Sequence, residues 1–394
     1  MSSIPSEQFV LRSRIPELDT LRGIAVLLVL FFHGFNLTPI HVARPAKVVG
    51  WFLGATAGGW MGVNLFFVLS GFLITGILLN TRSAPHYYRE FYRRRALRIL
   101  PAYYLILAVL LLVTRLGMAN RNVGWPFLGL SFVYLANVTD LFGVASQYTV
   151  LWSLAVEEHF YLLWPTAVRW LTRRGLTIAC IVLVAGCPAL RAFYYLRGYE
   201  YGAGYTWLTA DGLACGALLA ILVRGALGSR RGLMLFAAGT AVLALAVFVG
   251  GLPYGIYLSR TLAGGAFRYT FLNLAFTAVV AGALAVSATR FASLLRIGWL
   301  KFFGDISYGL YLVHMLAFDV VDHFGARLLP SIYSTPQGFL TVCLRFLVGS
   351  GFSITLAYGS RWYFEERFLR LREKRESIPT ATLPKAAEEV AAAS

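Results

Sequence analysis

The chain has 394 residues, of which 58% are hydrophobic and only 13% are charged. A soluble globular protein carries roughly 25% charged residues, so the composition excludes an ordinary soluble domain. The formal net charge of +17 would suit a nucleic-acid-binding protein, but the basic residues lie mostly in short segments between apolar runs. A nucleic-acid face requires a soluble basic surface, so we expect no nucleic-acid partner.

Apolar runs long enough to cross a bilayer recur along almost the whole chain. One transmembrane helix needs about 20 predominantly apolar residues. The sequence predicts ten spans, at residues 21–37, 60–79, 99–116, 151–170, 176–196, 206–223, 232–250, 270–288, 303–322 and 339–360. We therefore expect an all-α polytopic membrane protein, with a single transmembrane domain over residues 21–360.

Three segments lie outside these predicted spans. Residues 127–139 are apolar but short, and we expect a re-entrant or interfacial segment there. Residues 1–20 are polar and are predicted to be a cytoplasmic N-terminal segment without a signal-peptide cleavage site. Residues 361–394 are predicted to be a charged cytoplasmic tail that is disordered at its end.

The segment between the second and third predicted spans is expected to be a strongly basic loop. It contains Arg82, Arg89, Arg93, Arg94, Arg95 and Arg98. Cytoplasmic loops of membrane proteins carry an excess of Lys and Arg. If this loop is inside, the basic segments at 169–174, 224–231, 290–301 and 361–375 are inside as well. We therefore expect both termini in the cytoplasm and the chain in the inner (plasma) membrane.

Several ionisable residues lie inside predicted spans, where they are costly and indicate a functional site by default. His33 follows Arg22 by eleven residues, which on an α-helix returns to nearly the same face about 16 Å further along. A buried structural histidine explains His33 equally well. Glu157 lies in an aromatic helix beside Glu158 and His159. A carboxylate in such a helix must be paired or face a wet cavity.

Other polar residues have simpler interpretations. Asp211 and His314 are best explained as interhelical hydrogen-bonding residues. The arginine cluster at 93–98 fits membrane topology, anionic lipid head groups or a ligand with several phosphates. Ser70 follows an aromatic run without a G-x-S-x-G elbow, which disfavours a serine hydrolase. Four cysteines lie in apolar runs without metal-ligand spacing, so we expect packing roles and no metal site. They are Cys180, Cys187, Cys215 and Cys343.

Six stretches in chain order resemble the signature motifs of the acyltransferase 3 family of integral membrane O-acyltransferases. They are residues 17–25, 62–72, 95–101, 152–162, 211–213 and 307–314. The first is followed by His33, which stands with Arg22 in the family's R-x10-H arrangement. The third contains the R-x-x-R element as Arg95 and Arg98. The fourth has His159 where the family usually has glutamine.

This resemblance implies acyl transfer from a donor, usually acyl-CoA, to a hydroxyl group. Family acceptors include envelope polysaccharides and glycosylated or macrolide natural products. We expect a short acyl group, acetyl by default, with acetyl-CoA as a donor substrate and no permanently bound cofactor. Larger family members carry an extracytoplasmic esterase-like domain. We expect none here, since the sequence ends soon after its last predicted span.

The mechanism needs a base for the hydroxyl proton, a site for the donor, and stabilisation of the developing negative charge. Our hypothesis assigns His33 as the base, because imidazole titrates near neutral pH, with Glu157 as a supporting carboxylate. Arg22 orients the base or binds a donor phosphate. The donor site is predicted to contain Arg94, Arg95, Arg98 and Ser70, because arginine binds phosphate with two parallel hydrogen bonds.

A second class of function remains open at this point. A transporter or flippase without acyl-transfer chemistry would also need buried histidine and carboxylate side chains, together with cytoplasmic arginines that contact membrane lipids. Such a protein would move its substrate unchanged and would consume no acyl-CoA. A covalent acyl-serine on Ser70 is also left open by the residues alone.

Overall fold

The computed structural model describes residues 15–40, 42, 46–120, 123–199, 204–287, 289–335 and 337–376. Within these residues every regular element is helical, apart from one isolated bridge between Val42 and Gln337. The prediction of an all-α protein is therefore confirmed. Most of the predicted N-terminal segment and the end of the predicted tail, residues 1–14 and 377–394, lie outside the described residues.

The helices differ widely in length. The long ones are α1 (Pro16–Asn36), α3 (Gly62–Asn80), α4 (Tyr87–Arg115), α6 (Leu151–Trp170), α7 (Arg173–Leu196), α10 (Arg230–Gly251), α11 (Leu262–Ser287), α13 (Ser307–Leu328) and α15 (Phe339–Gly359). The shorter ones are α2 (Lys47–Ala57), α5 (Trp125–Phe132), α8 (Thr206–Thr209), α9 (Asp211–Val223), α12 (Gly298–Asp305), α14 (Pro330–Ser334) and α16 (Glu366–Glu376). The short 3-10 helices are η1 (Gly58–Met61), η2 (Thr139–Phe142), η3 (Leu252–Tyr254) and η4 (Arg290–Leu295), and η5 (Ser360–Glu365) is a π-helix.

Seven segments among the described residues are long and apolar enough to cross a membrane, so the protein is a multi-pass membrane protein. They are Pro16–Asn36, Lys47–Asn80, Tyr87–Arg115, Arg173–Leu196, Arg230–Tyr254, Leu262–Ser287 and Phe339–Leu371. The predicted number of ten spans is not confirmed. The missing three are helices in the structure, but each is interrupted or carries ionisable residues.

The predicted span 206–223 is divided between the short helices α8 and α9, and the span 303–322 is divided between α12 and α13. The span 151–170 is the continuous helix α6, but it contains two glutamates and an arginine. The apolar segment 127–139 does not form a spanning helix, as predicted. Its helix α5 has eight residues, about 12 Å in length, and ends in a turn where Tyr134 has a positive φ of 59°.

The predicted basic loop and the start of the predicted tail are both largely helical in the structure. Most of the basic loop forms the first three turns of α4, because Arg is a good helix former and Glu90 pairs with Arg93 at 2.6 Å one turn later. The tail beyond Arg361 continues through the π-helical η5 into α16, which packs against α4. An ion pair of 2.6 Å between Arg361 and Glu366 spans the join.

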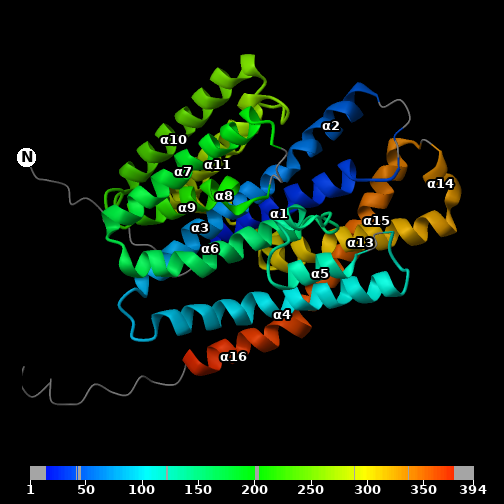
Figure 1. Ribbon diagram of the computed structural model, residues 1–394, viewed down its shortest axis with the longest axis horizontal. Coiled ribbons are helices and arrows are strands. Elements are labelled where there is room, and N and C mark those ends of the chain that lie inside the picture. The colour runs from blue at the N-terminus through cyan, green and yellow to red at the C-terminus, as the bar shows by residue number, and fades with distance from the viewer. Residues whose placement is uncertain are drawn as a thin grey trace, which may run out of the picture.

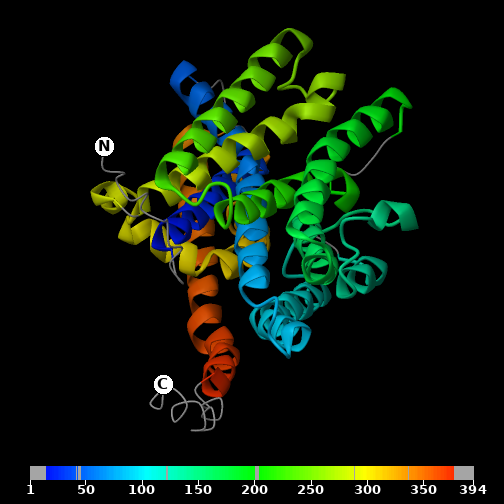
Figure 2. The ribbon, with the colours of Figure 1, turned by 90° about the vertical axis from the view of Figure 1, so that its left-hand side faces the viewer.

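The helices form one elongated bundle in which α1 and α3 lie in the middle (Figure 1). On one side of them lie α7, α9, α10 and α11, and on the other side lie α4 and α16; Figure 2 shows the same separation. The most extensive pairwise contacts join α10 with α11, α3 with α9, α13 with α15, and α1 with α12. The turn between α3 and α4 contacts the turn between α6 and α7, because Arg82 donates to the carbonyl of Leu171 at 2.9 Å.

Glycines allow α3 and α9 to pack with their backbones in contact. A Cβ atom at Gly71 would lie 2.0 Å from the carbonyl oxygen of Leu213, and one at Gly216 would lie 2.0 Å from that of Val68. Small residues at such crossings are the usual way for membrane helices to approach closely. The same packing brings Arg224, at the end of α9, within 3.0 Å of the side-chain oxygen of Asn80 at the end of α3.

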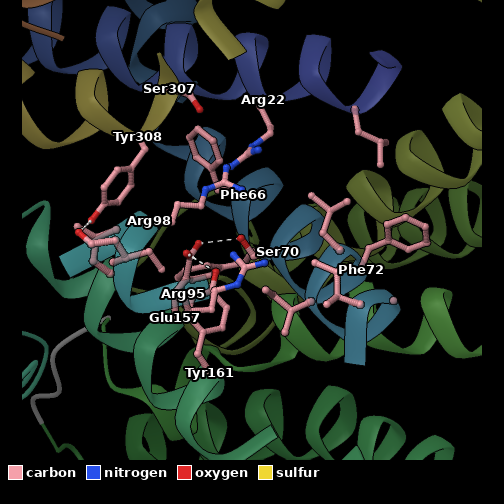
Figure 3. Close-up of a pocket in the computed structure, with 18 of the residues that line it drawn as sticks. Arg22, Phe66, Ser70, Phe72, Arg95, Arg98, Glu157, Tyr161, Ser307 and Tyr308 are labelled. Carbon is pink, nitrogen blue, oxygen red and sulfur yellow. Dashed lines mark hydrogen bonds between the residues drawn. The ribbon is translucent and has the colours of Figure 1, made fainter. Parts of the chain in front are cut away.

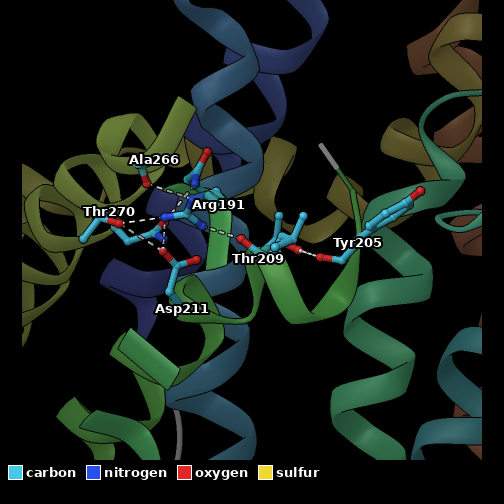
Figure 4. A network of polar contacts seen from close by, with 9 residues as sticks. Arg191, Tyr205, Thr209, Asp211, Ala266 and Thr270 are labelled. Carbon is cyan, nitrogen blue, oxygen red and sulfur yellow. Dashed lines mark hydrogen bonds and ion pairs between the residues drawn. The ribbon is translucent and has the colours of Figure 1, made fainter. Parts of the chain in front are cut away.

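A buried arginine joins α7, α9 and α11 (Figure 4). Arg191 is 1% exposed and donates to Asp211 at 2.9 Å, to Thr270 at 2.7 Å and to the carbonyl of Ala266 at 2.8 Å. It also donates to the carbonyl of Leu208. The interhelical role predicted for Asp211 is confirmed, and its partner is an arginine within the predicted span 176–196.

Candidate active site

A cavity of about 330 Å³ opens between the helices at the centre of the bundle. Its walls come from α1, α3, α4, α6 and α13, together with Arg224, which directly follows α9. On α3 alone the lining residues run from Val63 to Asn80, about 26 Å along the helix axis. Asn80 and Arg224 line it beside the last residue of α3, whereas Tyr311, which contacts Ser153 and packs on Phe66, lines it beside the start of α3. The cavity therefore reaches from the basic end of the bundle towards its middle.

Four arginines line this cavity: Arg22, Arg95, Arg98 and Arg224. Arg22 on α1 and Arg98 on α4 extend into it from opposite sides, towards one another (Figure 3). The guanidinium carbon of Arg95 lies 5.4 Å from the ring centroid of Tyr161, a distance that fits a cation–π contact. Three carboxylates, those of Asp19, Glu157 and Glu158, also line the cavity, so the arginines leave it with a small excess of positive charge that favours an anionic ligand.

The position of Arg22 follows from its neighbour in the sequence. A Cβ atom at Gly23 would lie 2.0 Å from the carbonyl oxygen of Leu300 on α12. Glycine at this position therefore lets α1 lie directly against α12. The adjacent Arg22 is on a different face of α1, about 100° away, and reaches the cavity.

Glu157 lies against the arginines at the centre of the cavity. One of its oxygens accepts a hydrogen bond from the Ser70 hydroxyl at 3.2 Å, and the other accepts one from the Tyr161 hydroxyl at 2.9 Å (Figure 3). Glu157 and Tyr161 are four residues apart on α6, so they share one helix face. Arg95 interacts electrostatically with both Glu157 and the neighbouring Glu158. The carboxylate is therefore held in place by donors on two helices.

His33 lies beyond the cavity and contacts a second histidine. Its Nδ1 is 2.9 Å from the carbonyl oxygen of Val29 and 3.3 Å from Nε2 of His314. The Nδ1 of His314 is in turn 3.1 Å from the carbonyl oxygen of Leu310. The two rings meet edge to face, with centroids 4.8 Å apart and planes at 67°. His314 therefore makes an interhelical contact, as predicted, and its partner is His33, the residue assigned above as the base.

These contacts select one pair of tautomers. The carbonyl of Leu310 can only accept, so Nδ1 of His314 carries a hydrogen and its Nε2 carries a lone pair. The carbonyl of Val29 also accepts, so Nδ1 of His33 carries the hydrogen that is shared with Nε2 of His314. This arrangement puts the lone pair of His33, and hence its basic position, on Nε2.

The histidine pair and the cavity are joined through Tyr311. Its ring centroid lies 5.8 Å from that of His314, and its hydroxyl lies 2.6 Å from the Ser153 hydroxyl. Tyr311 and Ser153 both line the cavity. The pair therefore lies next to the end of the cavity that is remote from Arg224.

The structure brings together most, but not all, of the predicted site residues. Arg22, Ser70, Arg95, Arg98 and Glu157 share the cavity. The predicted support of His33 by Glu157 stays a prediction, because the hydrogen bonds seen for Glu157 join it to other residues. The hydrogen bonds of Glu157 go to the hydroxyls described above, and the residue placed against His33 is the histidine of α13.

Arg94 does not line the cavity. It is 39% exposed and its Nε lies 3.8 Å from a carboxylate oxygen of Glu90, one turn earlier on α4. The reason is helical geometry. Arg95 and Arg98 are three residues apart and share a face, whereas consecutive residues such as Arg94 and Arg95 point about 100° apart. The role predicted for Arg94 in donor binding therefore has no support from its position.

Sequence reasoning missed three residues of the site. From the sequence alone, Arg224 is only one of the basic residues that indicate membrane topology, although it caps a short apolar helix that packs on α3. Tyr161 could have been found from its i+4 spacing to Glu157. Tyr311 gave no such signal, because an aromatic residue in an apolar span is ordinarily a packing residue.

Comparison of the sequence with known protein families shows to which family the chain with this cavity belongs. Residues 15–362 match the model of a family described as an acyltransferase domain. The chain belongs to this acyltransferase family. The match includes the cavity and both histidines, and it confirms the resemblance carried by the six motifs.

Curated relatives include bacterial O-acetyltransferases. The peptidoglycan O-acetyltransferase OatA of Listeria monocytogenes serovar 1/2a is 27% identical over 330 residues, which cover 77% of this chain and 49% of the relative. The putative peptidoglycan O-acetyltransferase YrhL of Bacillus subtilis is 36% identical over 45% of this chain and 28% of its own length. The O-acetyltransferase OatA of Staphylococcus aureus is 31% identical over 41% of this chain and 26% of its own length.

The chain thus spans about half the length of the first of these relatives and little more than a quarter of the other two. No solved structure matches the chain.

Proposed function

We propose that this protein is a membrane O-acetyltransferase that moves an acetyl group from acetyl-CoA to a hydroxyl group of a carbohydrate. In this proposal the arginine-lined cavity holds the donor, and His33 is the general base. The observation that carries it is the position of the cavity, which is lined by four arginines and reaches Tyr311, the residue that packs against the histidine pair.

The donor assignment rests on charge and length. CoA carries three phosphate groups and a long pantetheine arm that ends in the thioester. Arginine binds phosphate with short, charge-assisted and often bidentate hydrogen bonds. Arg22, Arg95, Arg98 and Arg224 supply such donors along a narrow cavity. With the phosphates held near the arginines, the arm runs along α3 and presents the acetyl group near Tyr311.

The chemistry proposed for His33 is a single acyl transfer. Its Nε2 takes the proton of the acceptor hydroxyl as the oxygen forms a bond to the acetyl carbonyl carbon. The tetrahedral intermediate then collapses, the carbon–sulfur bond breaks, and the CoA thiolate takes a proton from the His33 imidazolium. The products are the acetyl ester and free CoA. During the step Nδ1–H of His33 keeps its hydrogen and donates a hydrogen bond to Nε2 of His314, which stabilises the positive ring.

The acceptor and the orientation follow from different lines of support. The relatives named above as peptidoglycan O-acetyltransferases favour a cell-envelope carbohydrate over a macrolide. The basic segments that line one end of the bundle favour a cytoplasmic position for both termini in the plasma membrane. Donor binding would then begin on the cytoplasmic side, where acyl-CoA is made.

The test is binding and turnover of acetyl-CoA by the purified full-length protein in detergent. The wild type is compared with Arg95→Ala/Arg98→Ala, with His33→Ala, and with Arg94→Ala as a matched control on the same helix. We expect the first variant to lose acetyl-CoA binding and the second to bind normally without transfer to a peptidoglycan-fragment acceptor. The control should behave like the wild type, because Arg94 lies outside the cavity.

Two results would contradict the proposal. If the wild type binds no short acyl-CoA, the donor assignment is wrong and the transporter interpretation takes its place. If His33→Ala transfers acetyl at the wild-type rate, the protein can still be an acetyltransferase, but its base is another residue.

A further inference from the structure

We propose that Arg345 and Asp322 are positioning residues for His33, acting as a clamp that joins α1, α13 and α15. This inference rests on the proposed function, in which His33 is the base. Neither residue lines the cavity, and neither is needed for donor binding. Their contact is to the backbone of the residue that follows His33.

The clamp is a buried ion pair joined by two parallel hydrogen bonds. Nε of Arg345 donates to Oδ1 of Asp322 at 2.7 Å, and Nη2 donates to Oδ2 at 2.5 Å. Their side chains are only 3% and 7% exposed. The ring centroid of Phe318 lies 4.8 Å from the guanidinium carbon, and the Tyr333 hydroxyl donates to Oδ1 of Asp322 at 3.3 Å. Such a pair has one defined geometry, since two parallel hydrogen bonds fix the planes of both groups.

The third nitrogen of the same guanidinium holds α1. Nη1 of Arg345 donates to the carbonyl oxygen of Gly34 at 2.5 Å. The last four carbonyls of an α-helix have no partner within the helix, and Gly34 is among them in α1. The segment is also tightly enclosed, because a Cβ atom at Gly34 would lie 2.4 Å from the ring of Phe346 and 2.9 Å from that of Phe318. The buried carbonyl therefore takes its hydrogen bond from α15.

The clamp connects the two helices that carry the histidine pair. Gly34 is adjacent to His33 on α1, and Asp322 lies eight residues after His314 on α13, about 12 Å along the helix. A shift of α1 relative to α13 changes the 3.3 Å contact between the rings, and the clamp resists that shift near the site of the contact. A misplacement of about 1 Å can reduce turnover on the order of 100-fold.

The test separates positioning from stability by removing both charges together. A buried ion pair can often be replaced by apolar residues without loss of stability, whereas removal of one partner leaves a buried charge and is strongly destabilising. We therefore compare the wild type with Arg345→Met/Asp322→Leu. We expect this variant to fold and to have a KM for acetyl-CoA within about twofold of the wild-type value. Its kcat should fall about 10- to 100-fold.

The matched control is Arg191→Met/Asp211→Leu, which removes the other buried arginine–aspartate pair described above. That arginine donates to carbonyls of α8 and α11 and not to α1, so kcat should stay within about threefold of the wild type. If the apolar clamp variant does not fold, Arg345→Gln/Asp322→Asn is used, because the two amides can still hydrogen-bond to one another. The same loss of kcat is expected.

A second measurement does not depend on acyl transfer. The rate at which diethyl pyrocarbonate modifies His33, followed by mass spectrometry, should rise severalfold in the clamp variant and not in the control. A folded clamp variant with wild-type kcat and unchanged modification of His33 would overturn the inference. A wild type that transfers no acetyl group would refute the proposed function instead, and the modification rate would still decide whether the clamp holds His33.

Discussion

His314→Phe isolates the contribution of the second histidine to the proposed reaction. Phenylalanine keeps a flat ring at a position that is 1% exposed, but it removes the lone pair that accepts the Nδ1 hydrogen of His33. In the resting pair this is a hydrogen bond between neutral groups, worth about 0.5–1.5 kcal/mol. In the transition state His33 is positively charged, and the same bond is worth about 1.5–3 kcal/mol.

The difference between the two states is what changes the rate. Losing about 1–1.5 kcal/mol more from the transition state than from the resting state lowers kcat roughly 5- to 13-fold, because 1.36 kcal/mol corresponds to tenfold. The long contact of 3.3 Å favours the lower end of this range. The KM for acetyl-CoA should not change, because His314 does not line the donor cavity.

The assay is the release of CoA, followed with a thiol reagent, at saturating acceptor. Two matched variants accompany it. His314→Gln keeps a side-chain acceptor and should recover most of kcat. His323→Phe changes a half-buried histidine of the same helix that contacts Asn120, and it should leave kcat unchanged. A His314→Phe enzyme with kcat within twofold of wild type, or with an increased KM and normal kcat, would refute the role given to the pair.

Three further predictions concern the framework and the cavity. Gly216→Leu should lower the free energy of unfolding by about 1–3 kcal/mol or prevent folding, because its Cβ would lie 2.0 Å from a backbone oxygen. The measurement is thermal stability in detergent, and the control is Gly239→Leu, whose Cβ would have nothing within 4 Å. Arg191→Met alone should lower the free energy of unfolding by about 3–5 kcal/mol, since Asp211 is left buried without its cation. The double variant Arg191→Met/Asp211→Leu should recover the melting temperature of the wild type. Tyr161→Phe should retain acetyl-CoA affinity but lower kcat. Tyr161→Ala should also weaken acetyl-CoA binding, because Arg95 loses the ring beneath it. Equal affinities in the two variants would contradict a role of the Tyr161 ring in holding Arg95.

The sequence predicts the class of the fold well but its helix boundaries less well. Hydropathy alone marks apolar segments, so it finds α7 and α10 close to their observed positions but misses the first two turns of α11. It cannot tell a basic loop from a basic helix, because the same arginines satisfy membrane topology in either form. The segment around Arg95 is an example: its helical structure depends on local propensity and on packing against α16, and neither appears in a hydropathy profile.

The candidate site was predictable where the chemistry is local in sequence. Arg22 with His33, and Arg95 with Arg98, are pairs on one helix each, and their spacing alone shows that they share a face. Partners on other helices were not predictable in this way. Arg345 and Asp322 lie inside predicted spans, so the cost of burying a charge could have indicated that they matter. It could not have indicated that they hold the backbone beside His33, which depends on how three helices meet.

The helix α1 gives these observations a common physical basis. It carries Arg22 in the donor cavity and His33 in the histidine pair, about 16 Å apart along one rigid element. Near the first residue, Gly23 packs directly on the backbone of α12, and near the second, the carbonyl of Gly34 is held by Arg345. In the proposed mechanism, fixing both ends of α1 fixes the distance between the arginine assigned to a donor phosphate and the histidine assigned as the base. If the donor is acetyl-CoA, as proposed, that fixed distance requires its long arm to be extended, with the thioester beside the histidine pair rather than elsewhere in the cavity.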